Sequence, residues 1–331
     1  MSKKVRWGIL STANHALKVL VPAIGESEHG EVVAIASRDA AKANQTADEH
    51  HIPASHGSYE ALLADPNVDV IYIPLPNGLH KEWAIRTAQA GKHCLCEKPL
   101  ALNAGEAEEI VAAFRSAGKK LAEAFQWRHH PQCQHVRDSV RAGDIGDLRL
   151  IEAGFSFMLN RPNDVRWDPA LGGGALYDVG CYPISLARYI AGAEPLAVTA
   201  QIHWNKSGVD DLVAATLEFP GEIFATINCA FILPLRRYYE VVGTTGSLMV
   251  PRAYNPTSAF VAQVVRREDD RKKNKKFKFG RKNSYALMVE DFNMAVLENR
   301  DPLFPGEDGI GNMRVIDAIF QAAREGRTVK L

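Results

Sequence analysis

Short apolar runs alternate with longer amphipathic stretches through the first third of the chain. The apolar runs occupy residues 5–10, 32–36, 68–75, 93–96 and 120–125. The stretches between them that are rich in Ala, Glu and Lys are typical of helices, at 39–51, 80–91 and 103–116. Strands and helices that alternate at this spacing form a parallel sheet with helices on both faces. The pattern predicts an N-terminal α/β domain of this kind over residues 1–124.

The rest of the chain follows a different pattern. After a helix predicted at 131–142, longer apolar runs predict strands at 148–158, 196–204, 212–219, 223–232, 238–242 and 260–266. Further helices are expected at 174–190, 285–299 and 309–324. Strands joined by short turns form mostly antiparallel sheets. We therefore expect an α/β protein whose second domain, residues 125–331, is an α+β domain with a large, mostly antiparallel open sheet.

Charge and cysteine usage narrow the classes of partner. Of 331 residues, 39 are Lys or Arg and 39 are Asp or Glu, so the net charge is zero and no nucleic-acid partner is expected. The longest apolar runs are too short for a membrane helix, and the first apolar run is too short for a secretion signal. The five cysteines include no Cys-x-x-Cys pair, which favours buried thiols in a reducing, cytoplasmic setting.

Neither the histidines nor the most basic segment of the chain indicates a binding site. The 11 histidines show no spacing typical of a metal site, so no metal is expected. Residues 266–282 are rich in Lys and Arg, which suggests either a nucleic-acid patch or an exposed edge strand whose charges discourage aggregation. The neutral total charge favours the edge strand.

A turn that suits a dinucleotide follows the first predicted strand. Such turns read G-x-G-x-x-G or G-x-G-x-x-A, and here Ser11, Ala13 and Ala16 stand at the three small positions. Small side chains still let the backbone approach a pyrophosphate. Ser11, Ala13 and their neighbours Thr12 and Asn14 are therefore candidate phosphate contacts.

The end of the second strand bears on the choice between NAD and NADP. NAD-binding domains carry an acidic residue here that accepts hydrogen bonds from the ribose 2′-hydroxyl. Ser37 and Arg38 instead suit a 2′-phosphate, and Lys42 lies one turn further on. Asp39 leaves two alternatives, the N-cap of the next helix or a ribose acceptor shifted by one position. The pattern favours NADP, with NAD as the alternative.

Three further motifs carry a resemblance to a known family. Glu97-Lys98-Pro99 follows the fourth strand, and Pro74-Leu75-Pro76-Asn77 with His80 follows the third. The stretch 172–182, GGGALYDVGCY, opens a predicted helix. With the turn at Ser11, these motifs resemble the Gfo/Idh/MocA oxidoreductases over nearly the whole chain. The similarity is greatest to the branch of glucose–fructose oxidoreductase, NADP-dependent D-xylose dehydrogenase and dimeric dihydrodiol dehydrogenase.

The resemblance implies that residues 1–124 form a dinucleotide-binding Rossmann domain, and it implies roles for these residues. Pro74, Leu75, Asn77, His80 and Glu97 would line the cofactor. Lys98 would lie between the nicotinamide ribose and the substrate, next to a Lys98–Pro99 peptide bond that is cis in some relatives. Tyr182 would be the acid–base group, with Asp178 near it. The second domain would supply the substrate pocket and the oligomer interface.

Elementary chemistry agrees with an acid–base pair of Lys98 and Tyr182. A free tyrosine has a pKa near 10, and a nearby ammonium favours the phenolate. Such a phenolate can remove the hydroxyl proton of an alcohol as hydride leaves its carbon. A continuous helix would place Asp178 and Tyr182 on one face, although Pro183 would kink or restart that helix.

Several other residues are candidates for the same site. Trp127 and Arg128 follow the last Rossmann strand and suit a sugar face or the cofactor, with a structural linker as the alternative. Asn160, Arg166 and Trp167 lie in a polar loop, where they could cover the nicotinamide or touch the substrate. Tyr285, at the start of a late helix, is a further substrate candidate.

These observations predict an NADP-dependent oxidoreductase acting on a sugar. The first hypothesis is oxidation of an aldose such as xylose or glucose at C1. A keto-sugar reductase and a trans-dihydrodiol dehydrogenase would use the same residues. A cofactor-binding sensor and a redox-neutral hydrolase are alternatives from other classes, and loss of Lys98 or Tyr182 would mark the sensor. A homodimer formed through the open sheet is expected.

Overall fold

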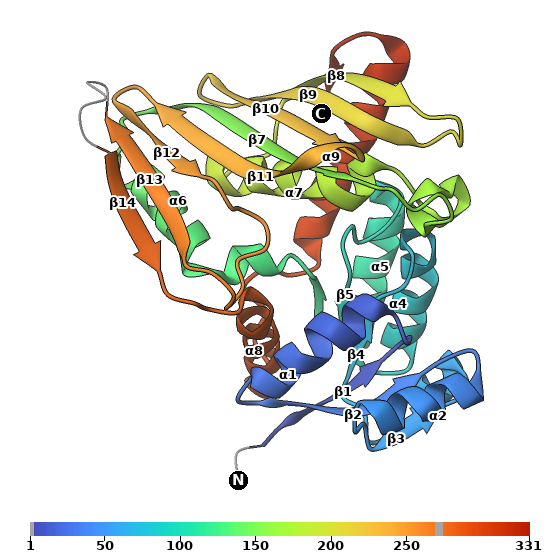
Figure 1. Ribbon diagram of the computed structural model, residues 1–331. Coiled ribbons are helices and arrows are strands. Elements are labelled where there is room, and N and C mark those ends of the chain that lie inside the picture. Colours follow the sequence, from blue (N-terminus) through green and yellow to red (C-terminus); the bar gives the residue numbers. More distant parts are fainter. Residues whose placement is uncertain (1–2, 269–273) are drawn as a thin grey trace. The chain divides into compact units, whose positions relative to one another are not determined.

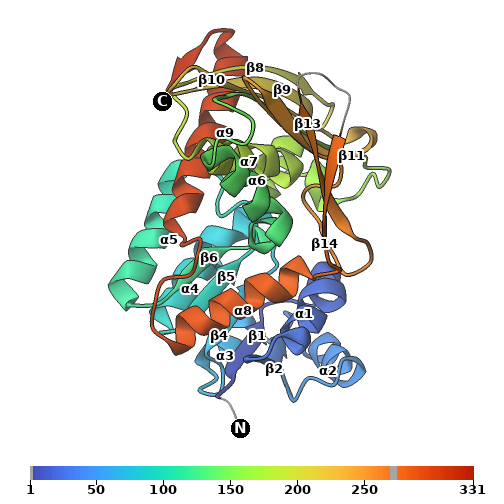
Figure 2. The ribbon, with the colours of Figure 1, turned by 90° about the vertical axis from the view of Figure 1, so that its left-hand side faces the viewer.

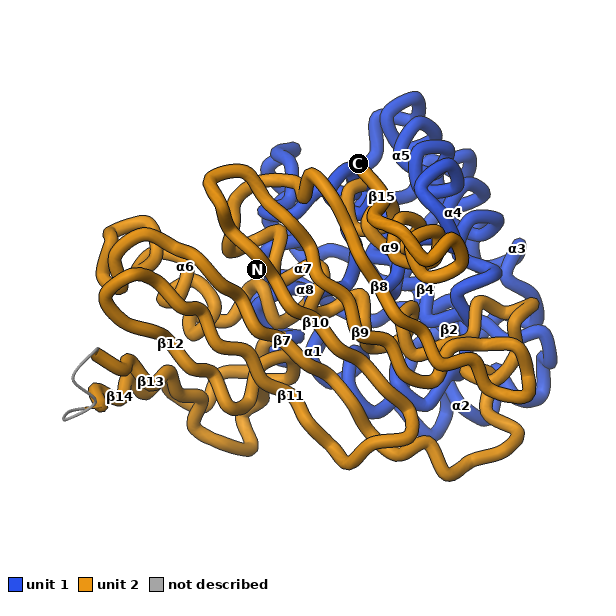
Figure 3. The backbone as a smooth tube through the Cα atoms, turned by 90° about the horizontal axis from the view of Figure 1, so that it is seen from above, with its two compact units in different colours: residues 1–125, 285–310 blue, residues 126–284, 311–331 orange. Residues whose placement is uncertain are grey.

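The computed structural model describes residues 3–268 and 274–331, which fall into two compact units. The first unit comprises Met1–Phe125 and Tyr285–Ile310, and the second comprises Gln126–Ser284 and Gly311–Leu331 (Figure 3). Both units are therefore built from two separate stretches of chain.

The first unit contains a six-stranded parallel sheet in the order β3-β2-β1-β4-β5-β6. Its strands are β1 (Val5–Ile9), β2 (Gly30–Ala36), β3 (Ala54–His56), β4 (Val70–Ile73), β5 (His93–Cys96) and β6 (Leu121–Glu123). This is the predicted Rossmann sheet. The three-residue strand β3 escaped prediction because its half-buried residues form no apolar run.

Helices and short helical turns connect these strands (Figure 1). They are η1 (Ala16–Leu20), α1 (Val21–Glu26), α2 (Ala40–Glu49), α3 (Tyr59–Ala64), η2 (Asn77–Leu79), α4 (His80–Gln89) and α5 (Ala104–Ala117). The helices predicted at 39–51, 80–91 and 103–116 correspond to α2, α4 and α5. The connection after β1 is a π-helical turn followed by α1, and the sequence pattern had not indicated either.

A late helix completes the core of the first unit. Helix α8 (Ser284–Leu297) buries Met288, Val289 and Phe292 against strand and helix residues from the start of the chain. Trp7 on β1 donates its indole N–H to the side-chain oxygen of Asn293, 2.9 Å away. Packing therefore places residues 285–310 with the Rossmann unit, whereas the sequence pattern assigned them to a second domain running from 125 to the end of the chain.

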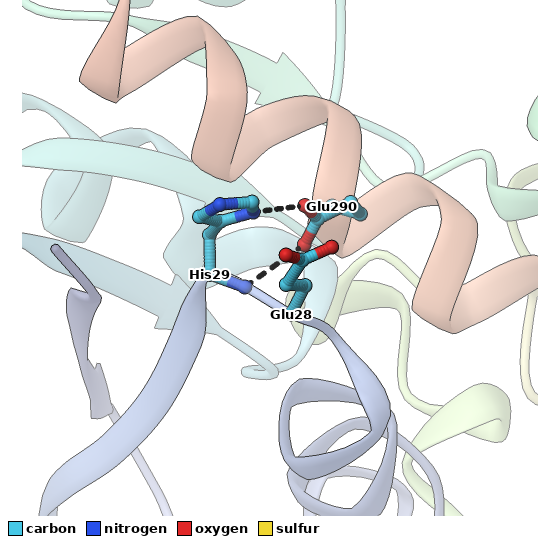
Figure 4. A group of neighbouring side chains, drawn as sticks. All are labelled: Glu28, His29 and Glu290. Atoms are coloured by element: carbon cyan, nitrogen blue, oxygen red, sulfur yellow. Dashed lines mark hydrogen bonds and ion pairs between the residues drawn. The ribbon is translucent and has the colours of Figure 1, made fainter. Parts of the chain in front are cut away.

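An ion pair also joins α8 to the start of β2. His29 Nδ1 lies 2.5 Å from the Glu290 carboxylate, which accepts the His29 backbone N–H as well (Figure 4). The hydrogen bond to Glu290 raises the pKa of His29. Glu28 completes a group of three side chains with the right atoms for a metal. Since His29 Nδ1 already bonds Glu290, this group acts as a clamp between strand and helix.

The second unit is built on a nine-stranded sheet in the order β14-β13-β12-β11-β7-β10-β9-β8-β15. Its strands are β7 (Leu148–Met158), β8 (Ala197–Trp204), β9 (Asp210–Phe219), β10 (Ile223–Ala230), β11 (Ile232–Gly243), β12 (Gly246–Val250), β13 (Ala262–Glu268), β14 (Asn274–Phe279) and β15 (Val329–Lys330). Only β7 and β10 pair in parallel among these described strands. The prediction of a mostly antiparallel sheet is confirmed.

Helices of the second unit gather on one face of its sheet (Figures 1 and 2). They are η3 (Gln126–His129), α6 (Pro131–Arg141), η4 (Val165–Trp167), η5 (Pro169–Leu171), η6 (Leu176–Gly180) and α7 (Cys181–Ala191), with the later part of α9 (Glu307–Glu325). Helix α7 packs on β7 and β10, the central strands. The predicted helix 174–190 is thus a π-helical turn followed by an α-helix, a change that precedes Pro183.

The basic segment forms an edge of this sheet. Strands β13 and β14 pair antiparallel, and Lys275, Lys276 and Lys278 are exposed on the outermost strand. Residues 269–273 of the same segment lie outside the described residues. The described part agrees with a charged edge strand. In the part of the chain that the structure describes, no helix is long and apolar enough to cross a membrane.

Candidate active site

The turn after β1 keeps a glycine-like conformation although it contains no glycine. Ser11 has a φ of 155°, in the region that favours glycine, and its hydroxyl accepts the backbone N–H of Ala13 at 3.0 Å. Ala16 is fully buried at the start of η1, so the helical segment packs closely on the sheet. Thr12 is half-buried and Asn14 is exposed. The backbone of this turn can therefore approach a pyrophosphate.

Asp39 is engaged as a helix cap. Its carboxylate accepts the backbone N–H groups of Ala41 (2.9 Å) and Lys42 (3.2 Å) at the start of α2. Of the two alternatives left by the sequence, the structure shows the N-cap. Ser37 is buried at the end of β2, whereas Arg38 and Lys42 are exposed. The end of β2 therefore offers a hydroxyl and two cations, and its one carboxylate is bonded to the backbone.

Tyr59 connects the turn after β1 to the end of β2. Burial raises the pKa of Tyr59, while its hydrogen bonds to Ser11 and Arg38 act in the opposite direction. The ring packs edge-on against Trp83, with ring centroids 4.9 Å apart. Tyr59 begins α3, directly after the short strand β3. The sequence pattern gave no sign of this role, because neither element was predicted.

Glu97 is the centre of a mostly buried polar network. Its carboxylate accepts the hydroxyl of Tyr72 (2.5 Å) and lies 3.5 Å from His15 Nε2. Burial would raise the pKa of Glu97, but the hydrogen bond from His15 and the charges of His15 and Lys98 lower it to about 2. Glu97 is therefore a carboxylate at any physiological pH, directly before Lys98.

His80 braces the loop that carries Lys98. Its two ring nitrogens each lie 2.8 Å from a backbone carbonyl oxygen, one of Leu75 and one of Pro99. His80 is fully buried, and the Lys98–Pro99 peptide bond is cis. His80 therefore lies between the loop after β4 and the loop after β5, facing a carbonyl of each. Pro74 is likewise buried, and Asn77 is half-buried at the start of η2.

Tyr285 belongs to the first unit and lies beside His15, which follows the turn after β1. Its ring meets that of His15 edge-on, with centroids 5.8 Å apart. Its hydroxyl is close enough to Tyr72 to raise the pKa of that buried group, on which burial has the larger effect. The structure thus groups Tyr285 with the Glu97 network. Tyr285 lies on α8, in the second of the two stretches of chain that form this unit, so sequence spacing could not predict its neighbours.

Tyr182 lies in the first turn of α7, in the second unit. Its side chain is buried beside two aromatic rings, those of Phe155 on β7 and Tyr254, at centroid distances of 5.3 and 5.4 Å. Phe155 and Tyr254 are themselves stacked, with 10° between their planes. Packing on both neighbours restricts the ring of Tyr182 to a narrow range of orientations.

Asp178 and Arg166 form a close ion pair in the same unit. Arg166 Nε donates to Asp178 at 2.7 Å, and the guanidinium also donates to Asp164 at 3.1 Å. The charge of Asp178 is the main cause that raises the pKa of Arg166 above its ordinary value. Arg166, proposed from the sequence as a cofactor contact, therefore holds Asp178, the carboxylate four residues before Tyr182.

Glycines 173 and 174 allow the loop that carries Arg166 to fold closely against η6. A Cβ on Gly173 would lie 2.5 Å from the carbonyl oxygen of Arg166, and Gly174 has a φ of +121°. Trp167 donates its indole N–H to the carbonyl of Arg161 and packs edge-on against Phe231. Asn160 is exposed at the start of this loop. The triple-glycine motif thus has a packing reason.

Trp127 and Arg128 are buried inside the second unit. Trp127 meets the rings of Tyr189 and Tyr254 edge-on, and Arg128 Nε donates to the Ser185 hydroxyl at 3.0 Å. Each is exposed by 5% or less. Both side chains pack next to α7, which agrees with the structural alternative considered for them.

The two units together carry the predicted residues in two groups. The first unit holds Lys98 with the cofactor candidates of the Rossmann edge, and the second holds Tyr182, Asp178 and Arg166. The fold of the first unit, with its turn after β1 and the cations at the end of β2, is that of a dinucleotide-binding domain.

Comparison with known proteins agrees with this class. Residues 5–125 match the family described as "Oxidoreductase family, NAD-binding Rossmann fold", and residues 133–249 match the "GFO/IDH/MocA C-terminal domain". The chain belongs to the Gfo/Idh/MocA oxidoreductase family.

Relatives extend the similarity over the whole chain. D-xylose 1-dehydrogenase (NADP(+)) 2 from Haloferax volcanii is 39% identical, covering 98% of this chain and 99% of its own. Aldose-aldose oxidoreductase from Caulobacter crescentus has a TM-score of 0.92 at 30% identity, covering 99% and 100%. The 3-ketoreductase KijD10 from Actinomadura kijaniata, solved with NADP and TDP-benzene, has a TM-score of 0.91 at 31% identity, covering 97% and 98%.

Proposed function

We propose that this oxidoreductase uses NADP and oxidises a sugar at its anomeric carbon. The observation that carries the cofactor choice is the engagement of Asp39. Its carboxylate caps α2 through two backbone N–H groups, so the end of β2 presents Ser37, Arg38 and Lys42. A guanidinium and a hydroxyl suit the 2′-phosphate of NADP, whereas NAD-binding domains place an acidic acceptor at this point.

The residues present fit the dinucleotide. The backbone of Ser11, Thr12 and Ala13 would hold the pyrophosphate, since Ser11 keeps the glycine-like φ that such a turn needs. Arg38 would contact the 2′-phosphate, and it is oriented by a hydrogen bond to Tyr59, which also bonds Ser11. When bound, the nicotinamide supplies the acceptor for hydride.

Tyr182 acts as the base in this proposal. It takes the proton of the C1 hydroxyl, and the ammonium of Lys98 favours the phenolate that this role requires. Asp178, held by Arg166, keeps a negative charge near the start of α7. Phe155 and Tyr254 hold the ring of Tyr182 in place. The product of an aldopyranose would be a lactone.

Similarity to a D-xylose dehydrogenase supports an aldose as substrate. Reduction of a keto-sugar is the second candidate, and the likeness to a 3-ketoreductase over 97% of this chain favours it. Oxidation of a trans-dihydrodiol remains a third use of the same residues. A panel of aldoses, keto-sugars and diols distinguishes the three.

The first test is a fluorescence titration of the purified protein with NADPH and, separately, with NADH. We expect NADPH to bind more tightly, and NADP⁺ to be reduced in the presence of xylose or glucose. Tighter binding of NADH would overturn the cofactor assignment. Tight NADPH binding without turnover of any aldose would overturn the substrate assignment, and NADPH oxidation with a keto-sugar would replace it.

The cellular setting and the oligomer belong to the same proposal. The described cysteines are all buried and form no disulfide with one another, which agrees with a reducing cytoplasm. The open face of the nine-stranded sheet exposes large apolar side chains such as Met158 and Phe224 beside polar ones such as Thr199. We propose a homodimer through this face, and sedimentation equilibrium of the purified protein tests it.

A further inference from the structure

Asp210 is a buried carboxylate beneath the start of the segment that carries Asp178 and Tyr182. It begins β9, and only 1% of it is exposed. One carboxylate oxygen accepts the backbone N–H of Leu176, the first residue of η6, at 2.6 Å. The other lies where a Cβ on Gly174 would be 2.2 Å away, so the missing side chain at Gly174 makes room for it.

Backbone N–H groups hold this carboxylate. Burial raises the pKa of Asp210 to about 6, the charge of Asp211 acts in the same direction, and the N–H groups of Leu176, Asp210 and Ala175 oppose them. At neutral pH the group is therefore mostly ionised. Buried carboxylates normally have a counter-charge or several hydrogen bonds, because an isolated charge in the interior is costly.

The start of η6 needs an acceptor that its own sequence does not provide. The first N–H groups of a helix have no partner within it, and a side chain just before the helix usually supplies one. Here the N-cap residue of η6 is Ala175, and that of α7 is Gly180, and neither makes a side-chain cap bond. Asp210, 34 residues further along the chain, takes that place.

We propose that Asp210 is a positioning residue of the active site, which fixes Asp178 and Tyr182 by holding the backbone at Ala175 and Leu176. Asp178 follows Leu176 by two residues, so a shift at Leu176 moves its carboxylate away from Arg166. Tyr182 follows in the first turn of the continuing helix. The inference rests on the proposed function, because it assumes that Tyr182 carries the proton transfer.

The test compares Asp210→Asn and Asp210→Ala with a matched control, Asp211→Asn. Asp211 is the adjacent buried carboxylate, and it bonds His203 (2.6 Å) instead of the helix. We expect kcat to fall about tenfold in the Asn variant and about 100-fold in the Ala variant, because small misplacements of reacting groups have effects of this size. NADPH affinity stays unchanged, because the first unit binds it, and the control keeps its kcat.

A second measurement does not depend on turnover. Amide hydrogen exchange of a peptide covering residues 174–182 reports directly on the backbone that Asp210 holds. Faster exchange there in both Asp210 variants, with normal exchange in Asp211→Asn and a kcat loss larger than any loss of Tm explains, supports the proposal. Unchanged exchange in this peptide, or an equal kcat loss in the control, overturns it. If the wild type turns over no substrate, the proposed function fails, and the exchange result still decides the role of Asp210.

Discussion

Each unit buries a carboxylate that bonds the segment carrying its catalytic candidate, and the two carboxylates have different partners. Glu97 in the first unit has His15, Tyr72 and Lys98 as neighbours, and its pKa is lowered to about 2. Asp210 in the second unit has backbone N–H groups, and its pKa is raised to about 6. Burial raises the pKa in both cases. The comparison teaches that the partner of a buried carboxylate decides the direction of its pKa shift. Cations outweigh the effect of burial, whereas neutral N–H groups do not.

The largest effect is expected for the acid–base residue of the second unit. Tyr182→Phe removes the hydroxyl but keeps the ring packed against Phe155 and Tyr254, so the fold is preserved. We expect kcat to fall by about 10²- to 10⁴-fold, the usual range for loss of a general acid–base group. Steady-state kinetics measure this, and NADPH titration serves as the control. A variant with wild-type turnover would remove Tyr182 from the mechanism.

The comparison of the two carboxylates predicts opposite pH dependences of stability. Because the pKa of Glu97 falls from 4.5 to about 2 on folding, its ionisation contributes about 3 kcal/mol above pH 4.5, lost as the pH falls towards 2. Because the pKa of Asp210 rises from 3.8 to about 6, its ionisation costs about 3 kcal/mol above pH 6, regained as the pH falls towards 3.8.

Two amide variants sharpen this comparison. At pH 7 we expect Glu97→Gln to lower the free energy of unfolding in urea, whereas Asp210→Asn leaves it equal or higher. Chemical denaturation of both variants at pH 7 and pH 5 measures the difference. If both lose the same stability at pH 7, the two carboxylates are not held in the way described.

A smaller effect is expected at the end of β2, where Arg38 would meet the cofactor. Arg38→Ala removes a charged hydrogen-bond donor, worth about 1.5 kcal/mol or more, so NADPH binding should weaken about tenfold. NADH has no 2′-phosphate, and its affinity should stay the same. Fluorescence titration of both nucleotides gives the ratio. Equal weakening for NADH would mean that Arg38 contacts another part of the dinucleotide.

The smallest effect concerns the clamp between β2 and α8. Because the hydrogen bond to Glu290 raises the pKa of His29, the ion pair stabilises the fold below the ordinary pKa of 6.5, and this stabilisation is lost as the pH rises through the raised value. His29→Gln should therefore lower Tm more at pH 6 than at pH 9. Thermal unfolding at both values is the measurement, and a loss independent of pH would contradict it.

Local patterns predicted the parts of the molecule that depend on local chemistry. Alternating apolar runs indicated the Rossmann strands, and short motifs pointed to Lys98, Asp178 and Tyr182. Long-range packing could not be predicted in this way. Tyr59, Asp210 and Tyr285 reach their neighbours across tens or hundreds of residues, and no spacing relates them. The aromatic ring of Trp127 and the guanidinium of Arg128 are groups that suit a sugar, and only the structure shows that both are buried in the interior.

The split composition of the first unit has a consequence for how the protein is made. Its sheet is complete once residue 125 has been synthesised, yet the apolar surface that α8 covers stays open until residue 285 and beyond have emerged from the ribosome. The bond from Trp7 to Asn293 spans 286 residues of sequence. Domains usually fold as units in the order of synthesis. Here the N-terminal domain cannot bury its full core until most of the second unit has been synthesised.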